Sequence, residues 1–242
     1  MLLIAMRFIS YLYKKTHNFL YPKLGVIYML HRLVEQRSEG KNRELEITPD
    51  FLKQTINNYR RQGYRFVSID EACDIISHGR TDHPFVCLTF DDGYQDNYDL
   101  AYPILKQENV PFAIYVTTGF IDNRLPMWWF TNEKLGISAE ALKILDADPL
   151  CTIGAHTISH PKLDTLSFEE QRAEIMQSKQ ELEALLSHPI HHFSYPHGAY
   201  NTDTLKIVSG SHFVSALCAW GGTIRKGDSD LLELPRIELK EQ

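Results

Sequence analysis

Short runs of consecutive apolar residues recur along the chain, and polar residues follow each of them. In the clearest run, 85–90 (F-V-C-L-T-F), apolar and β-branched residues succeed one another without alternation. This pattern is typical of a strand that is buried on both faces of a parallel sheet. Similar runs predict further strands at 25–30, 65–69, 112–116, 151–155, 192–195, 213–220 and 231–239.

Segments with a helical spacing of apolar residues separate these runs. One helix is expected to begin at Thr48, a capping residue, with Pro49 at its first helical position. Another follows Ser167, which can form a capping box with Glu170. Further helices are expected at 70–77, 98–107 and 139–145, whereas the charged segment 35–46 is expected to be a loop. Strands that alternate with helices, without a repeat or a linker, predict a parallel α/β architecture.

The composition narrows the class of protein. A chain of 242 residues with 43% hydrophobic residues can bury one complete core, so a single domain is expected over 25–242. A formal charge of -6 without any basic block argues against nucleic acid as a partner. The four cysteines lie far apart in the sequence and form no C-x-x-C pair, so they are expected to be buried, reduced thiols.

Residues 1–24 are predicted to form an N-terminal helix. The segment is rich in apolar residues, but Arg7 interrupts it and it is too short to span a bilayer. Two interpretations remain open, a helix that makes peripheral contact with a membrane surface and an ordinary packing helix. The segment lacks a cationic leader followed by a cleavage site, which favours a cytoplasmic protein, with inner-membrane association as the alternative.

Two adjacent carboxylates, Asp91 and Asp92, end the clearest strand, and Gly93 permits a sharp turn after them. Sheets of α/β proteins place their chemistry at the carboxyl ends of the strands. Neighbouring side chains on an extended segment diverge. We therefore expect the two aspartates to have different partners, so that one binds a cation and the other handles a proton.

Two histidines, His156 and His160, follow another predicted strand, and a single turn between them can bring both rings to the same side. Two imidazoles and one carboxylate are the ligand set of an open catalytic zinc site. Nitrogen ligands favour zinc, cobalt, nickel or iron over magnesium or calcium. The sequence therefore suggests a divalent transition metal at this edge of the sheet.

Three segments together resemble the polysaccharide deacetylase family (NodB homology, carbohydrate esterase family 4): T-F-D-D-G-Y at 89–94, H-T-I-S-H-P at 156–161 and F-S-Y-P-H-G at 193–198. The resemblance implies a distorted (β/α) barrel of about seven parallel strands. It also implies a hydrolase that uses a divalent metal, zinc before cobalt, nickel or iron, to remove acetyl groups. The implied substrate is an acetylated glycan or glycolipid, namely a sugar of a bacterial cell-surface polysaccharide or its precursor. N-acetyl groups are expected, and O-acetyl groups are the alternative.

Carried over position by position, the resemblance implies that Asp91 is the general base. The expected metal ligands are Asp92, His156 and His160. A backbone N–H near His197 is expected to stabilise the oxyanion, and Thr157 and Ser159 to brace the loop between the histidines. The expected substrate-binding residues are Tyr195, Pro196, His197 and Trp129.

Trp129 belongs to an aromatic segment, 126–130, for which two interpretations remain open. Its rings either stack on a sugar or form a lid that packs on the core.

The chain also departs from the pattern of the family at two catalytic positions. Ser194 stands where relatives commonly have an arginine that pairs with the catalytic aspartate, and we predict that Arg236 replaces it. The histidine that protonates the leaving amine in relatives is missing, because no histidine follows His212. We predict that His31 takes this role, with His197 and His212 as alternatives. If none of the three reaches the leaving group, O-acetyl substrates are expected instead.

Two other interpretations remain open, and the departures support the first of them. One is a catalytically impaired protein that retains the fold and binds or assembles carbohydrate. The other is a metal-dependent hydrolase of a different amide. The presence of Asp91, Asp92, His156 and His160 argues against the first, because costly buried charges should disappear once catalysis is lost.

Overall fold

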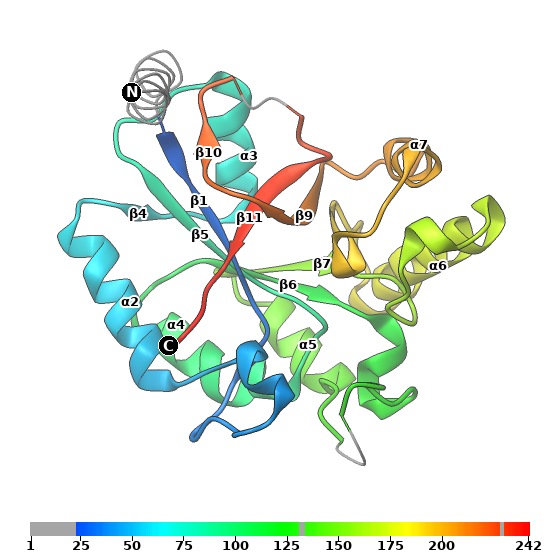
Figure 1. Cartoon of the computed structure of the whole chain (residues 1–242), viewed down its shortest axis with the longest axis horizontal. Helices are drawn as coiled ribbons and strands as arrows, with labels where there is room; N and C mark the ends of the chain where they lie inside the picture. Colours follow the sequence, from blue (N-terminus) through cyan, green and yellow to red (C-terminus); the bar gives the residue numbers. More distant parts are fainter. Residues whose placement is uncertain (1–22, 131–133, 228–229) are drawn as a thin grey trace, which may run out of the picture.

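A closed ring of parallel strands forms the core of the protein (Figure 1). The computed structural model describes residues 23–130, 134–227 and 230–242. The ring closes because the first strand pairs in parallel with both the last strand and the fifth. Its members, in chain order, are β1 (Lys23–Leu30), β5 (Phe85–Phe90), β6 (Phe112–Val116), β7 (Cys151–Ala155), β8 (His192–Ser194), β9 (Ser215–Gly221) and β11 (Leu234–Glu238). The predicted (β/α) barrel of about seven parallel strands is therefore confirmed.

Among the described residues, four short strands lie outside the ring. β4 (Arg65–Phe66) pairs with β5, and β10 (Ile224–Arg225) runs antiparallel to β1. β2 (Arg32–Leu33) and β3 (Glu46–Ile47) form a separate small sheet. The strand predicted at 65–69 is therefore too long, because Ser68 caps a helix that begins at Ile69.

Helices surround the barrel (Figure 1). They are α2 (Pro49–Arg61), α3 (Ile69–His78), α4 (Tyr102–Gln107), α5 (Ala139–Asp146), α6 (Phe168–Leu186) and α7 (Thr202–Gly210). The caps predicted at Thr48 and Ser167 are present, since each side-chain oxygen accepts a backbone N–H of the first turn. The sequence pattern did not indicate α7, although Asn201 begins it with a capping box.

Shorter helical turns connect several of these elements. They are η1 (Lys41–Leu45), η2 (Asn97–Ala101), η3 (Thr118–Asn123), η4 (Leu163–Thr165) and η5 (Pro196–Gly198). η2 is a π-helix, so the helix predicted at 98–107 is regular only in its second half. η1 and β3 lie in the segment predicted as a loop.

β5 is buried on both faces, as its unbroken apolar run predicts. Val86, Leu88 and Phe90 belong to the larger apolar cluster. Phe85 and Cys87 belong to a second cluster, which also contains apolar residues of α3. All four cysteines are buried and free, as expected.

The predicted N-terminal helix, 1–24, lies outside the described residues, apart from Lys23 and Leu24, which belong to β1. No helix within the described part of the chain is long and apolar enough to cross a membrane.

Two phenylalanines, Phe112 and Phe168, differ in how deeply they are buried. Phe112 is fully buried and packs edge-on against Phe90 with ring centroids 6.2 Å apart, whereas Phe168 is 41% exposed. Phe112→Ala should lower the free energy of unfolding by about 3–5 kcal/mol, because it leaves a cavity in the core. Phe168→Ala should change it by about 0.5 kcal/mol or less. Denaturant unfolding measures both values, and similar losses in the two variants would contradict this description of the core.

Candidate active site

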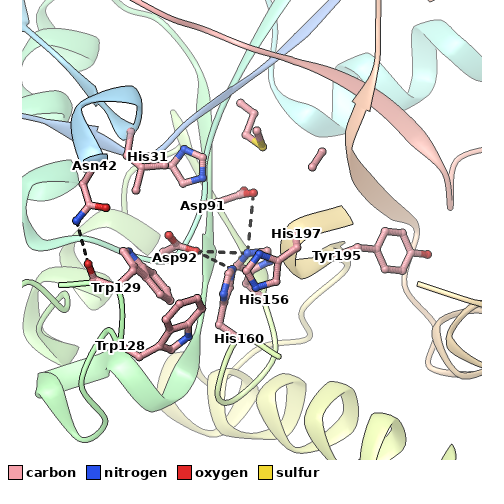
Figure 2. A pocket seen from close by; sticks show the side chains of 13 residues that line it. His31, Asn42, Asp91, Asp92, Trp128, Trp129, His156, His160, Tyr195 and His197 are labelled. Atoms are coloured by element: carbon pink, nitrogen blue, oxygen red, sulfur yellow. Dashed lines mark hydrogen bonds and ion pairs between the residues drawn. The ribbon is translucent and has the colours of Figure 1, made fainter. Parts of the chain in front are cut away.

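Polar side chains gather at the carboxyl ends of the barrel strands (Figure 2). His31 follows β1, Asp91 and Asp92 follow β5, and His156 follows β7. Because all strands of the ring are parallel, these ends open at the same mouth of the barrel. A cavity of about 210 Å³ lies there, and its lining includes His31, both aspartates, His156 and His160.

The three predicted metal ligands lie together and are buried. Within the described residues, Asp92, His156 and His160 are the one group of His, Cys, Asp and Glu side chains whose ligand atoms all lie within 4.8 Å of one another. Oδ1 of Asp92 lies 3.5 Å from Nε2 of His156 and 3.2 Å from Nε2 of His160. The structure thus brings together residues from two predicted strand ends, as the sequence led us to expect.

The donor set fits a divalent metal. Nδ1 of His156 donates to the backbone carbonyl of Ser194 over 2.8 Å, which leaves the lone pair of Nε2 facing the cluster. Oδ1 of Asp92 is buried and has no hydrogen-bond partner among the described residues. An orphaned carboxylate oxygen beside two imidazole nitrogens is costly unless a cation satisfies it.

For Asp92 and His160, the electrostatics of the cluster agree with this fit. Burial favours the neutral form of Asp92, but His160 and His156 outweigh it and hold the pKa of this carboxyl below its ordinary value. Burial lowers the pKa of His160 to about 3, so its imidazole is neutral. For His156, burial is outweighed by Asp91 and Asp92, which raise its pKa. Asp92 is therefore ionised and His160 can offer a lone pair, as metal ligands must.

Asp91 points to a different partner, as expected for adjacent carboxylates. Nη1 of Arg236 donates to its Oδ1 over 2.8 Å, and Nη2 donates to its Oδ2 over 2.6 Å. Burial alone would raise the pKa of Asp91, but the Arg236 guanidinium and His156 outweigh it, and the pKa lies below its ordinary value. Asp91 is therefore a carboxylate that does not need a metal to remain ionised.

Arg236 lies on β11 and is 1% exposed, yet all five of its N–H donors have acceptors. Besides Asp91, it donates to the Thr89 hydroxyl, the Ser194 hydroxyl and the Cys218 carbonyl. Ser194 in turn donates to Oδ2 of Asp91 over 3.2 Å. The arginine expected at position 194 is thus replaced in space by an arginine from another strand, and the serine leaves room for it.

Several residues at the mouth have left-handed backbone angles. φ is 72° at Asp92, 66° at Thr157, 60° at His160 and 57° at His197. Such a conformation costs roughly 1–3 kcal/mol per non-glycine residue and persists only where surrounding contacts impose it. One such contact is internal, because the Thr157 hydroxyl accepts the backbone N–H of His160 over 3.1 Å. Thr157 therefore braces the loop, as expected.

The three candidate acids occupy different places. His31 and His197 both line the cavity. His31 is close enough to Asp91 and Asp92 to interact with both charges. The His197 ring lies 4.4 Å from that of His160, centroid to centroid. His212 is exposed just after α7 and is not among the residues that line the cavity.

The predicted substrate-binding residues differ in what they present to the cavity. Trp129 lines it, with its ring 4.9 Å from that of His160 and its indole N–H bonded to the Tyr94 hydroxyl. Tyr195 also lines the cavity, but its ring points away from the cluster (Figure 2) and its hydroxyl donates to the carbonyl of Leu232. Pro196 is buried and does not line the cavity. The third motif thus faces the cavity mainly through His197.

Sequence reasoning missed two residues near the mouth, Asn42 and Trp220. Asn42, in the segment predicted as a loop, lines the cavity and donates to the carbonyl of Trp129 over 2.9 Å. Trp128, which belongs to the aromatic segment singled out in the sequence, lines the cavity, is 66% exposed and lies near His197. Trp220 is 54% exposed and lies so close to Gly198 that a Cβ there would meet its ring at 2.1 Å. Isolated polar and aromatic residues of this kind have no periodicity that could have identified them.

Comparisons with known proteins give a consistent result. The family model described as "Polysaccharide deacetylase" matches residues 78–213. A curated protein of Bacillus subtilis (strain 168), YxkH, is 28% identical over 73% of this chain and 60% of its own length. The chain therefore spans about three fifths of the length of this relative.

Two solved structures are also similar. Streptococcus pyogenes deacetylase PplD, in complex with acetate, is 26% identical with a TM-score of 0.77, over 89% of this chain and 92% of that one. IcaB from Ammonifex degensii has the same fold, with 24% identity and a TM-score of 0.75 over 90% of this chain and 92% of that one.

The buried pair of Asp91 and Arg236 can be tested by its energetic coupling. Arg236→Met should lower the free energy of unfolding by about 3–5 kcal/mol, because the Asp91 carboxylate stays buried without its cation. Adding Asp91→Leu removes that unpaired charge and should recover at least about 1 kcal/mol. Denaturant unfolding with a chelator present measures both values without a contribution from bound metal.

The pair of Arg65 and Glu71 serves as the matched control, since its side chains are 51% and 43% exposed. Its coupling should be about 1 kcal/mol or less. Equal coupling energies for the two pairs would contradict the role assigned to the buried one.

Proposed function

Because this chain belongs to the polysaccharide deacetylase family, we propose that it is a metal-dependent hydrolase that removes acetyl groups from a sugar of a bacterial cell-surface polysaccharide or its precursor. The family consists of hydrolases that act on carbon–nitrogen bonds of acetylated sugars. The observation that carries the proposal is the buried cluster of Asp92, His156 and His160 beside the separately paired carboxylate of Asp91. That PplD was solved in complex with acetate, the product of deacetylation, supports the same reaction here.

We assign the metal to Asp92, His156 and His160, and zinc is our first choice of ion because its open catalytic sites use this ligand set. When bound, such an ion supplies a Lewis acid for the acetyl carbonyl and lowers the pKa of a water molecule towards about 7. The chain itself orients the metal ligands and provides the space for the substrate. His156 is oriented by the Ser194 carbonyl, and the cavity lies directly against the cluster.

Asp91 is proposed as the general base that accepts a proton from the attacking water. It lines the cavity, and its Oδ2 lies 3.9 Å from Nε2 of His156. Arg236 keeps this carboxylate ionised and fixes its orientation through two hydrogen bonds. Because Asp91 is not one of the proposed metal ligands, its carboxylate can accept a proton without first dissociating from the metal.

His31 is proposed as the general acid that protonates the leaving amine. It lines the cavity across from the metal cluster (Figure 2), and its own carbonyl accepts the Asn97 amide over 2.7 Å, which holds the end of β1 in place. His197 also lines the cavity and remains the second candidate, while the position of His212 argues against it. A single histidine beside the leaving group is sufficient for this step.

Trp129 and His197 are the proposed substrate-binding side chains. Both line the cavity, as does exposed Trp128, whose ring lies 6.3 Å from that of His197. Exposed Trp220 lines a neighbouring pocket together with His197. Aromatic faces of this kind suit the apolar faces of sugar rings. Tyr195 and Pro196 are proposed to act through the backbone that leads to His197, because the Tyr195 hydroxyl points away from the cluster and Pro196 is buried.

The alternative of an impaired carbohydrate-binding protein loses one of its two supports. It was favoured by the missing arginine and the missing histidine of the family pattern, and Arg236 now pairs with Asp91 in the place of the former. The metal content of the protein discriminates between the two functions.

Purified protein, freed of loosely held ions, should contain about one zinc or similar ion per chain. Asp92→Ala should lose this metal, since it removes the carboxylate of the ligand set. Asp91→Asn should retain the metal but release acetate from acetylated glycans about 10²–10⁴-fold more slowly, because only the base is lost. Elemental analysis and an acetate assay, with and without a chelator, measure these outcomes.

Absence of metal from the wild-type protein, even after incubation with zinc or cobalt, would refute the hydrolase mechanism and favour the binding-protein alternative. Normal acetate release by Asp91→Asn would refute the assignment of the base alone.

The proposed acid can be tested with two leaving groups. His31→Gln should lower kcat/KM for an N-acetyl sugar by about 10²-fold or more, because an amine must be protonated as it leaves. The same variant should hydrolyse an aryl acetate nearly as well as wild type, since a phenolate leaves without a proton. His197→Gln is the matched variant, and we expect it to raise KM for the sugar. A selective loss in His197→Gln instead of His31→Gln would exchange the two roles.

A further inference from the structure

The loop that carries the two metal-ligating histidines, 156–160, must be held in place by its surroundings. Two of its residues, Thr157 and His160, have left-handed backbone angles that β-branched and bulky residues disfavour. Both imidazoles nevertheless face one carboxylate oxygen, that of Asp92. The contacts that hold this loop therefore decide whether the metal ligands converge.

Thr117 and the first residues of η3 hold the loop by hydrogen bonds to the carbonyl groups of the loop. The hydroxyl of Thr117 donates to the carbonyl of His156 over 3.0 Å. The next two backbone N–H groups, of Thr118 and Gly119, donate to the carbonyls of Thr157 and Ile158 over 3.0 and 2.8 Å. On this side the N–H of His156 donates to the carbonyl of Val116, and the N–H groups of Ile158 and Ser159 remain for another partner.

A single carboxylate on α6, that of Glu174, holds the loop from the opposite side. Its Oε2 accepts the backbone N–H groups of Ile158 and Ser159 over 2.8 and 3.0 Å. Its Oε1 accepts the hydroxyl of Ser159 over 2.6 Å. Hydrogen bonds to a charged acceptor are among the stronger ones in proteins. Glu174 thus makes three such bonds to the segment between the two ligands.

The other carboxylates of α6 have different partners. Glu169, Glu181 and Glu183 pair with the basic side chains of Arg172, Arg124 and Lys179. Glu170 accepts the backbone N–H and the hydroxyl of Ser167 in the capping box. Glu174 is the glutamate of this helix whose hydrogen bonds go to the histidine loop. Its contacts therefore act on the metal site and not on the helix surface.

We propose that Glu174 is a positioning residue for the metal centre, which holds the His156–His160 loop so that both imidazoles converge on Asp92. This inference rests on the proposed metal-dependent function. Groups that orient metal ligands typically contribute about 10–100-fold to metal affinity. Glu174 would do so through the backbone of the loop instead of through a histidine ring. Its effect should therefore appear in metal binding as well as in catalysis.

The test compares the affinity for zinc in metal-free wild-type protein and three variants, by competition with a chromophoric chelator. Glu174→Ala should raise the Kd for zinc about 10–100-fold, because two loop N–H groups lose their acceptor. Glu174→Gln should recover most of the affinity, since its amide oxygen can still accept both N–H groups. Glu169→Ala, on the exposed start of the same helix, should bind zinc like the wild type.

A purely structural role of Glu174 predicts a different result. In that case Glu174→Ala would unfold at a lower temperature without metal, but the folded protein would bind zinc as tightly as wild type, and that outcome would overturn the proposal. If Glu174→Ala does not fold, Glu174→Gln and Ser159→Ala decide, since each alters the contact mildly and should raise the Kd about two- to fivefold. An unchanged Kd in both would equally overturn it.

The same titration separates this proposal from the proposed function. Wild-type protein that binds no zinc or cobalt would refute the metal centre and with it the role of Glu174. Wild-type protein that binds metal and releases acetate, with unchanged affinity in the Glu174 variants, would refute the role of Glu174 alone.

Discussion

The buried ion pair between Asp91 and Arg236 is the interaction on which the arrangement of the mouth depends. It joins the end of β5 to β11, two strands separated by most of the chain, and every N–H of the guanidinium has an acceptor. A buried pair of this kind is tolerated only when its hydrogen bonds are complete. Because the first aspartate is fully occupied in this way, the second is free to face the histidines.

The contrast between the two aspartates explains how adjacent residues acquire different roles. Asp91 is satisfied by protein groups, whereas Oδ1 of Asp92 is buried without a partner among the described residues. Nδ1 of His160 is buried and unpartnered as well. Protein interiors rarely leave polar atoms unsatisfied without a functional reason. Two of the buried, unsatisfied atoms thus belong to residues that the sequence motifs had indicated.

Much of this could be predicted from the sequence because the relevant patterns are local. Parallel strands buried on both faces appear as unbroken apolar runs, and Thr48 and Ser167 have the residue types that cap helices. Partners that come from distant parts of the chain are harder to identify. Asn42 and Glu174 are single polar residues in unremarkable surroundings, and only the fold shows which backbone groups they contact. The direction of the Tyr195 side chain is likewise decided by packing, which no motif encodes.

The ring of strands also decides at which end of the barrel the chain enters and at which end it leaves. β1 and β11 are parallel neighbours, so the chain enters the barrel at Lys23 on the side away from the mouth and leaves it after Glu238 on the side of the mouth. The C-terminal residues are built into that side, since Glu241 accepts hydrogen bonds from Thr48 at the start of α2. A tether joined ahead of β1 would therefore meet the barrel at the end opposite the cavity and leave the opening unobstructed. A tether at the other terminus would place its bulk beside the opening.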